Sequence, residues 1–154
     1  MIGWKYGVIM EEKKLDKRSI ARIQAMKIIY IADFNGISID SSLTMGKTGF
    51  FNDNIAGEDE ISPETTELLN YVTNNLEKID NLINETITNY SINRLNLVDK
   101  AIIRVATGEM LLKKTDKRII INEALEITKL YSDQGDHKAT SFNNRLLDNI
   151  SKKI

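Results

Sequence analysis

The chain has 154 residues, of which 42% are hydrophobic and 28% charged, a balance typical of a soluble globular protein rather than a disordered or membrane-embedded one. Its formal net charge of −1 argues against indiscriminate coating of nucleic acid, so a polyanion site would need basic residues gathered on one surface. Cysteine is absent, which excludes disulfides and thiolate metal sites. Because no hydrophobic run reaches the roughly 20 residues of a membrane span and no signal peptide is recognised, we expect a cytoplasmic location and no membrane partner.

The first definite helix is predicted over about residues 13–34, after a segment, residues 1–12, that could be a docked arm or a frayed tail. Hydrophobic residues share one side of its helical wheel: Ile20, Ile23, Met26, Tyr30 and Phe34. Basic residues share the other side: Lys13, Lys14, Lys17, Arg18 and Arg22. Like charges four residues apart repel by roughly a few tenths of a kcal/mol per pair, so this face is either kept for an anion or simply solvated. From the residues alone, a solvated basic face is the simpler interpretation.

The next segment, residues 35–61, is rich in Gly, Asn and Asp. We expect a short helix over about residues 37–45, with Phe50 and Phe51 packing back into the core. The triplet at residues 46–48 is similar to the end of a phosphate-binding loop, but Ser41 stands where such a loop requires glycine. The sequence therefore does not support nucleotide binding.

A helix start is predicted at Ser62-Pro63-Glu64, which combines a capping side chain, proline at the first helical position and an acid in the first turn. Hydrophobic residues then continue at helical spacing from Leu68 to Ile87. They indicate either two helices with a bend near residues 74–75 or one long helix.

Three further helical patterns complete the chain. The first carries Val98, Ala101, Ile102, Val105 and Leu112 on one arc. Glu109 falls in that arc and should therefore have a bonding partner, whereas Asp99 falls on the exposed side. The second pattern covers residues 121–131, with Asn122-Glu123 expected to cap or pin its start. The third covers residues 141–150 and is anchored by Phe142, Leu146 and Ile150.

Six or seven helices without a strand predict an all-α protein of two packed helical sub-bundles, forming one domain over residues 1–154. Its inventory of reactive residues is poor, since the only histidine is His137. With Asp133 and Asp136 it forms a polar loop without recognisable ligand spacing. We therefore expect no catalytic site, no metal site and no cofactor, and interpret the chain as a binding protein.

The last three patterns, read together, resemble the NusB family of transcription antitermination factors. They are R-L-x-x-V-D-x-A-I-x-R-x-A-x-x-E from Arg94, I-N-E-A-x-E-x-x-K from Ile121, and F-x-N-x-x-L-D from Phe142. The first helix also fits the family pattern R-x-x-A-R-x-x-A-x-x-x-x-Y from Arg18. Two departures are that Arg145 stands where the family usually has glycine and that residues 132–140 form a longer loop.

The resemblance implies a transcription antitermination factor that binds the boxA element of ribosomal RNA leaders as single-stranded RNA. It would act as a heterodimer with NusE, a ribosomal small-subunit protein, within an antitermination complex on RNA polymerase. The implied RNA-binding residues are Lys14, Lys17, Arg18 and Arg22, and the implied partner-binding residues are Tyr30 and Asp99. The oligomeric state of the chain alone stays open, a homodimer included.

Two alternatives remain at this stage. One is an accessory module of a ribosomal RNA methyltransferase without its own catalysis, which the lack of a cofactor-binding domain after Ile154 disfavours. The other is a helical adaptor with no RNA role, in which the basic face is only solvated.

Overall fold

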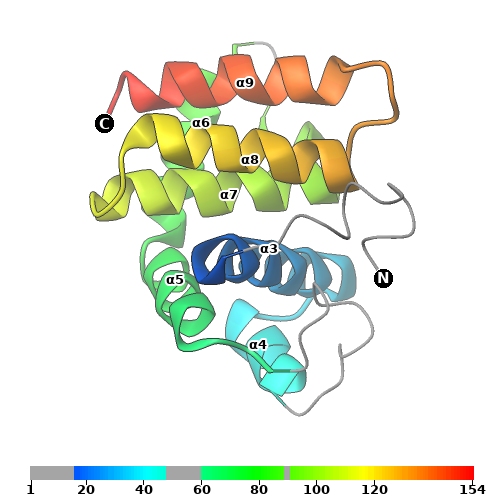
Figure 1. The fold of residues 1–154 in the computed structure, drawn as a ribbon, viewed down its shortest axis with the longest axis vertical. Helices are drawn as coiled ribbons and strands as arrows, with labels where there is room; N and C mark the ends of the chain where they lie inside the picture. The colour runs from blue at the N-terminus through cyan, green and yellow to red at the C-terminus, as the bar shows by residue number, and fades with distance from the viewer. Residues whose placement is uncertain (1–15, 48–59, 89–90) are drawn as a thin grey trace. The chain divides into compact units, whose positions relative to one another are not determined.

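The computed structural model describes residues 16–47, 60–88 and 91–154. These residues form seven α-helices and one 3₁₀-helix and contain no strand (Figure 1), which confirms the all-α prediction. The chain divides into two compact units, Met1–Glu67 and Leu68–Ile154, and the division falls inside a helix. The N-terminal segment 1–12, Lys14 and the predicted packing of Phe50 and Phe51 lie outside the described residues.

Unit 1 is built around helix α3, Lys17–Asn35, with α4, Ile39–Lys47, packed against it. The N-cap of α3 is Asp16, whose carboxylate accepts a hydrogen bond from the Ser19 amide at 2.8 Å. The helix ends at Gly36, which adopts a left-handed conformation with φ of 66° and donates to the last carbonyls. The short helix expected over residues 37–45 is therefore confirmed as α4.

The core of unit 1 lies along α3, where Ile23, Ile28 and Ile29 are almost fully buried. Helix α4 is tied to it by Ser42, whose hydroxyl donates to the Ile28 carbonyl at 2.7 Å. The predicted hydrophobic side is wrong at Phe34, which is 68% exposed. This residue lies in the last turn of α3, where the helix surface is no longer covered.

Helix α5, Pro63–Asn74, begins as predicted at Ser62, whose hydroxyl accepts a hydrogen bond from the Thr65 amide at 3.1 Å. Gln24, which is fully buried, fixes this start against α3. Its amide group donates to the Glu60 carbonyl at 2.9 Å, and its carbonyl oxygen accepts from the Ser62 amide and the Thr65 hydroxyl. The two ends of the Gln24 side chain are thus both satisfied.

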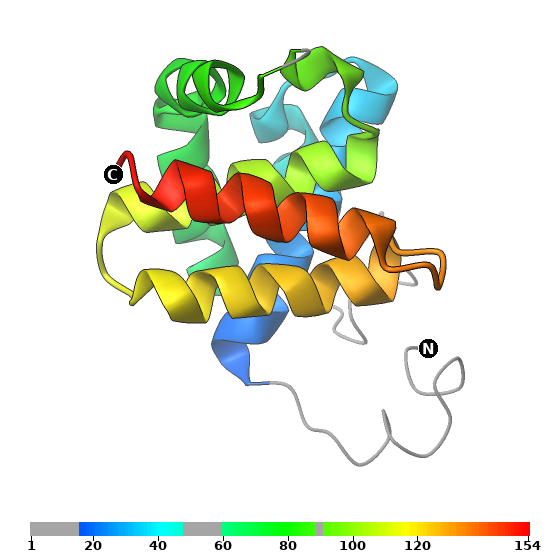
Figure 2. The same ribbon diagram turned by 90° about the horizontal axis from the view of Figure 1, so that it is seen from above.

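Unit 2 contains the end of α5 and the elements α6 Leu76–Thr86, 3₁₀-helix η2 Ile92–Arg94, α7 Leu97–Leu112, α8 Lys117–Tyr131 and α9 Lys138–Ser151. Figures 1 and 2 show α7, α8 and α9 side by side, and α6 packs against both α7 and α9. Short connections reverse the chain from α7 to α8 and from α8 to α9, which places these sequential helices in contact. Of the two alternatives that the sequence left open, the structure has two helices, with α5 ending at Asn74 and α6 beginning at Leu76.

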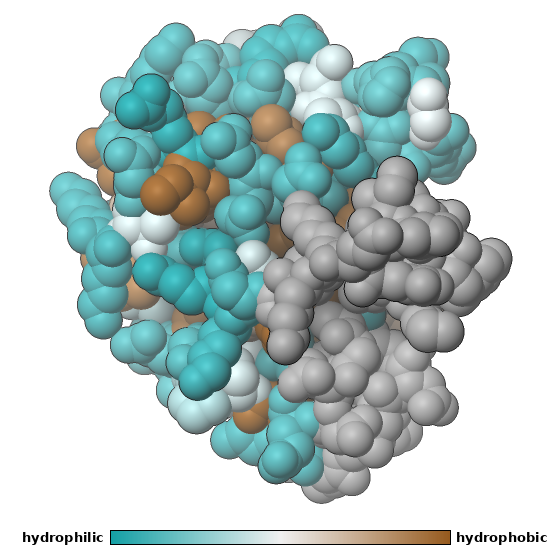
Figure 3. Space-filling view, viewed as in Figure 1, coloured by the Kyte–Doolittle hydropathy of each residue, from teal (hydrophilic) through white to brown (hydrophobic). Residues whose placement is uncertain are grey.

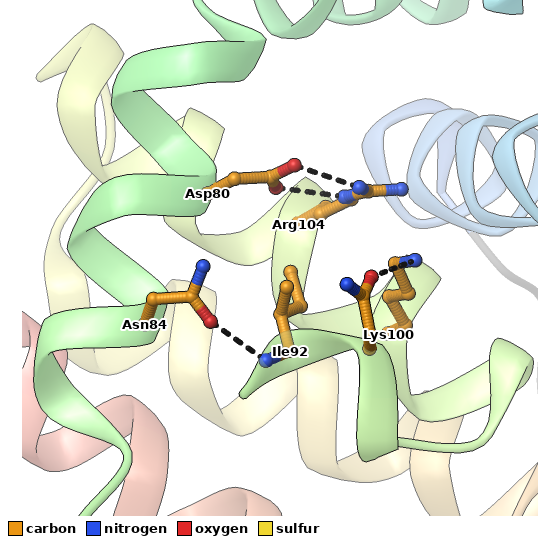
Figure 4. Close-up of polar contacts among 6 residues, drawn as sticks. Asp80, Asn84, Ile92, Lys100 and Arg104 are labelled. Carbon is orange, nitrogen blue, oxygen red and sulfur yellow. Dashed lines mark hydrogen bonds and ion pairs between the residues drawn. The ribbon is translucent and has the colours of Figure 1, made fainter. Parts of the chain in front are cut away.

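An ion pair holds α6 against α7, and a glycine on α7 lets α5 and α6 approach it closely. The guanidinium of Arg104 donates from Nε and Nη2 to the two carboxylate oxygens of Asp80, at 2.9 and 2.7 Å (Figure 4). Gly108 allows close approach, since a Cβ atom there would lie 2.8 Å from Val72 Cγ2 and 3.3 Å from Ile79 Cδ1. The connection after α6 is fixed by Asn84, whose side-chain oxygen accepts from the Ile92 amide at 2.7 Å.

Helix α8 begins four residues earlier than its hydrophobic pattern. Its N-cap is Asp116, which accepts a hydrogen bond from the Arg118 amide at 2.7 Å. The expectation that Asn122-Glu123 would cap this helix is therefore wrong, because both residues lie in its interior.

Among the described residues, no helix is both long and apolar enough to cross a membrane. The face in Figure 3 is largely hydrophilic, with hydrophobic residues in small patches.

Candidate nucleic-acid interface

The basic face of α3 is narrower than the sequence predicts. Lys17 and Arg18, in the first turn, are exposed, whereas Arg22, one turn later, is only 6% exposed. The predicted solvent-facing ladder is thus wrong at Arg22, and Lys14 lies outside the described residues. A helical wheel reports direction around the helix axis, but burial also depends on where along the axis the rest of the protein covers it. The exposed cations described on this face are Lys17 and Arg18.

Asp16 introduces a negative charge beside these cations. The hydrogen bond from the Ser19 amide lowers the pKa of Asp16, and the Ser19 hydroxyl, the charge of Arg22 and the Arg18 amide lower it further, against a smaller opposing effect of burial. Asp16 is therefore ionised at neutral pH and faces the positive end of the helix dipole. An approaching phosphate would meet Lys17 and Arg18 with this carboxylate close by.

Tyr30 and Phe34 form an aromatic pair toward the C-terminal end of α3. Their ring centroids are 6.0 Å apart, and the ring planes are inclined by 19°, an offset-stacked arrangement. Tyr30 is half-buried, while Phe34 is the most exposed large hydrophobic side chain among the described residues. An exposed aromatic ring held against a second ring is a ready contact for another protein. The helical wheel assigned both rings to the core, whereas the family resemblance implied a partner-binding role for Tyr30 alone.

The burial of Lys27, on the same helix, is a second property that the sequence does not reveal. Burial of its side chain lowers the pKa of Lys27 from 10.5 to about 8, because an ammonium ion loses hydration there. A lysine in a basic helix would ordinarily be assigned to a solvated face. Its environment depends on tertiary packing, which the residue type does not encode.

Asp99 is buried, contrary to the exposed position predicted for it, with 7% of its surface accessible. Its Oδ1 accepts hydrogen bonds from Ser132 Oγ at 2.6 Å and from Asn143 Nδ2 at 3.0 Å. Its Oδ2 accepts from Asn96 Nδ2 at 2.8 Å, and Asn96 in turn caps the Asp99 amide. The carboxylate thus joins the start of α7 to the end of α8 and to α9. The partner-binding role predicted for Asp99 would have to operate through so small an accessible surface.

Asp133 organises the connection between α8 and α9. Its carboxylate accepts hydrogen bonds from the amides of Gly135 and His137 at 2.8 and 3.1 Å, and from the amide and hydroxyl of Thr140 at 3.3 and 2.6 Å. The Thr140 hydroxyl contributes most to lowering the pKa of Asp133 to about 2, with the three amides adding to it. The sequence suggested only a polar surface loop here, and no residue pattern predicted the hydrogen bonds to Asp133.

Glu109 and His137 are two further titratable residues that the sequence analysis singled out. Glu109 is 5% exposed, as its place on the α7 arc predicts. Within the described ranges, no three His, Cys, Asp or Glu side chains lie close enough to hold a metal ion. His137 is exposed, and its backbone is left-handed with φ of 63°. The described surface of α3 thus presents cations at the start of the helix and an aromatic pair near its end.

Comparison with known proteins identifies related chains along most of the length. The family model described as "NusB family" matches residues 19–152. The transcription antitermination protein NusB of Syntrophotalea carbinolica is 39% identical over 147 residues, covering 88% of this chain and 92% of that protein. The protein of the same name from Clostridium botulinum is 36% identical over 139 residues, covering 88% of this chain and 98% of its own length.

Solved structures agree with this assignment. Thermotoga maritima NusB superimposes with a TM-score of 0.72 at 26% identity, covering 91% of this chain and 94% of that one. A chain from a crystal structure of the antitermination factors NusB and NusE in complex with double-stranded RNA gives a TM-score of 0.73 at 25% identity, covering 89% and 97%. The family match begins at residue 19, in the first turn of α3, and covers all of the helices of unit 2. On the sequence match and the shared fold together, this chain belongs to the NusB family.

Proposed function

We propose that this protein is a transcription antitermination factor that binds boxA RNA together with NusE. Support comes from the relatives named transcription antitermination protein NusB and from the similar chain found in a complex with NusE and RNA. The observation on this molecule that carries the proposal is the separation of two binding features on α3. Exposed cations lie at its start and an exposed aromatic pair lies near its end.

The proposed RNA contact is the first turn of α3. Lys17 and Arg18 would bind backbone phosphates, which supplies affinity that depends on salt but not on base sequence. Arg22 is buried, and its charge helps to keep Asp16 ionised, so its proposed contribution is to the arrangement of this turn. Two cations supply few phosphate contacts, which fits a protein that binds RNA tightly only when a partner adds a second contact.

The proposed NusE contact is the aromatic pair of Tyr30 and Phe34. Partly exposed aromatic rings are enriched at the energetic centres of protein interfaces, because they bury a large area with few rotatable bonds. Two contacts on one helix would allow RNA and NusE to be bound at the same time. Because the proposed role is the assembly of a transcription complex, we assign the protein to the cytoplasm and assign it no catalytic step.

Titration of a boxA-like RNA tests the RNA contact. We expect Lys17→Glu/Arg18→Glu to abolish measurable binding at moderate salt. The corresponding alanine variant should make the dependence of log affinity on log salt less steep by about 1.4, the value for two single-strand phosphate contacts. Lys152→Glu/Lys153→Glu changes net charge by the same amount just after the end of α9 and should bind nearly as wild type. Equal losses in both pairs, or no loss in the first, would reject this RNA contact; circular dichroism verifies that each variant is folded.

A further inference from the structure

The second half of α3 carries apolar side chains on two roughly opposite faces. One face is packed in the core and consists of Ala25, Ile28, Ile29 and Ala32. The opposite face consists of Tyr30 and Ile31, which are half-buried, and Phe34, which is 68% exposed. A helix that is apolar on all sides is ordinarily covered on all sides. The second face, which we call the α3 stripe, is therefore a surface that a further segment can cover.

The first twelve residues of the chain have the composition of a segment that packs against such a surface. Their hydrophobic residues are Met1, Ile2, Trp4, Tyr6, Val8, Ile9 and Met10. From Trp4 to Met10 every second residue is hydrophobic, the pattern of an extended segment with one apolar side. Tails that stay in solvent are poor in hydrophobic residues, because they have nothing to bury. The segment lies outside the described residues and precedes the family match, which begins at residue 19.

Two observations point to the α3 stripe as the surface for this segment. Among the described residues, the exposed large hydrophobic side chains are Phe34 and Ile119, and only Phe34 lies in the same compact unit as residues 1–12. The reach is also sufficient. From Lys17 to Phe34 the helix rises by about 26 Å, whereas an extended chain from Trp4 to Asp16 spans about 40 Å. Trp4 can therefore reach Phe34 while α3 stays folded.

We propose that residues 4–10 pack along the α3 stripe, with Trp4, Tyr6 and Val8 toward the helix, and that they cover the stripe when NusE is absent. The packing itself does not depend on the proposed function. The competition with NusE rests on it, because Tyr30 and Phe34 are the proposed NusE contact. A tethered segment has a high effective concentration at a nearby site, so a small contact is enough to occupy it. Only molecules with an uncovered stripe then bind NusE, and the apparent affinity falls by that fraction.

Trp4 is the only tryptophan in the chain, so its fluorescence reports the packing in the full-length protein. We expect its emission maximum at a shorter wavelength, and its quenching by acrylamide slower, than in a free peptide of residues 1–12. Phe34→Ala should shift the emission toward that of the peptide, whereas Ile119→Ala, which removes the other exposed hydrophobic side chain, should not. Emission like that of the free peptide in the wild-type protein, or equal responses to the two substitutions, would overturn the proposal. Circular dichroism verifies that each variant is folded.

A matched pair of substitutions within the segment tests the contact from its other side. Val8→Ser should shift the Trp4 emission to longer wavelength, and Ile9→Ser, on the opposite side of the alternation, should leave it nearly unchanged. A shift that is equal in both variants would contradict the assigned orientation. Emission that changes with protein concentration would identify a second copy of the chain as the occupant and would overturn an intramolecular contact.

Calorimetric titration with NusE tests the competition. Trp4→Ser/Val8→Ser should bind NusE more tightly than wild type, on the order of fivefold, because the stripe is no longer covered. Ile9→Ser should bind with an affinity close to that of wild type. Equal or weaker binding by the double variant would overturn the competition. Failure of every variant and of the wild type to bind NusE would reject the proposed function, whereas the emission of Trp4 decides the packing by itself.

Discussion

The side-chain amide of Asn143 donates to Asp99 Oδ1 at 3.0 Å and with its other hydrogen to Thr128 Oγ1 at 3.1 Å. Both Asn143 and Thr128 are fully buried. The two hydrogen bonds donated by Asn143 connect α9 to Asp99 on α7 and to Thr128 on α8 in the interior of unit 2. A carboxylate buried without a cation is tolerated only when its oxygens are hydrogen-bonded, and here Asn96, Ser132 and Asn143 provide those bonds.

Replacing Asp99 with alanine should therefore destabilise the protein. Asn96, Ser132 and Asn143 would each lose an acceptor, and because Asn143 is fully buried, the loss of these bonds should cost roughly 1–3 kcal/mol. Urea unfolding followed by circular dichroism measures the change. Asp148→Ala, on the exposed side of α9, is the matched control and should stay within about 0.5 kcal/mol of wild type. A loss as small as that in Asp99→Ala would contradict the role described here.

Gly108→Ala should also destabilise the protein, although alanine is the better helix former by about 1 kcal/mol. The new methyl group would lie 2.8 Å from Val72 Cγ2, and a β-branched side chain cannot rotate away freely. Overpacking of this kind costs about 1–3 kcal/mol, so the net loss should be up to about 2 kcal/mol. Asn144→Ala, exposed on α9, serves as the control. A chemical denaturation midpoint for Gly108→Ala at or above wild type would show that α5 can move away from α7 at little cost.

Lys27 should make stability depend on pH in a defined window. Its pKa falls from 10.5 in the unfolded chain to about 8 in the folded protein, so between these values the unfolded state binds more protons. Stability contributed through Lys27 therefore rises with pH from about 8 to 10.5, and below 8 the folded protein bears the whole cost of the buried charge. Lys27→Met should be more stable than wild type at pH 7, with the difference shrinking toward pH 10.5. A difference that is constant with pH, measured by urea unfolding, would contradict this.

Phe34→Ala should leave stability almost unchanged but weaken the capture of NusE. The ring is 68% exposed, so truncation creates little cavity in the core, whereas an interface would lose an aromatic anchor. Co-elution with NusE on size exclusion measures the effect. Ile119→Ala is the control, because Ile119 is 52% exposed on α8 in the other unit. Capture that is unchanged by Phe34→Ala, or reduced equally by Ile119→Ala, would rule out the aromatic pair as the contact.

The helices could be predicted from the sequence where a pattern is local. Hydrophobic spacing located the arc of α7, and the capping signal at Ser62 predicted the start of α5, whereas the spacing alone did not decide between one long helix and the separate α5 and α6. Burial at single positions could not be predicted in the same way. Arg22 lies on the side of α3 that carries Arg18, yet it is covered, and Phe34 lies on the hydrophobic side, yet it is exposed.

The burial of polar groups inside unit 2 could not be predicted from the sequence either. Asp99 falls on the exposed side of its own wheel, but Ser132 and Asn143, more than 30 residues away, supply donors that make its burial favourable. Asp133 appeared to belong to an ordinary surface loop because the amides it binds are backbone groups, which every residue possesses. A sequence pattern predicts how a residue is placed on its own helix, whereas the burial and hydrogen bonding of these residues depend on neighbours that are distant in sequence.

The close approach at Gly108 makes two positions interdependent over evolutionary time. Since the space beside Gly108 is filled by Val72, a homologue that acquires alanine at the first site should have a smaller side chain at the second. Either replacement alone leaves a collision or a void, and both together restore the original volume. Natural variation at these two positions should therefore be correlated: a larger side chain on α7 should accompany a smaller one on α5.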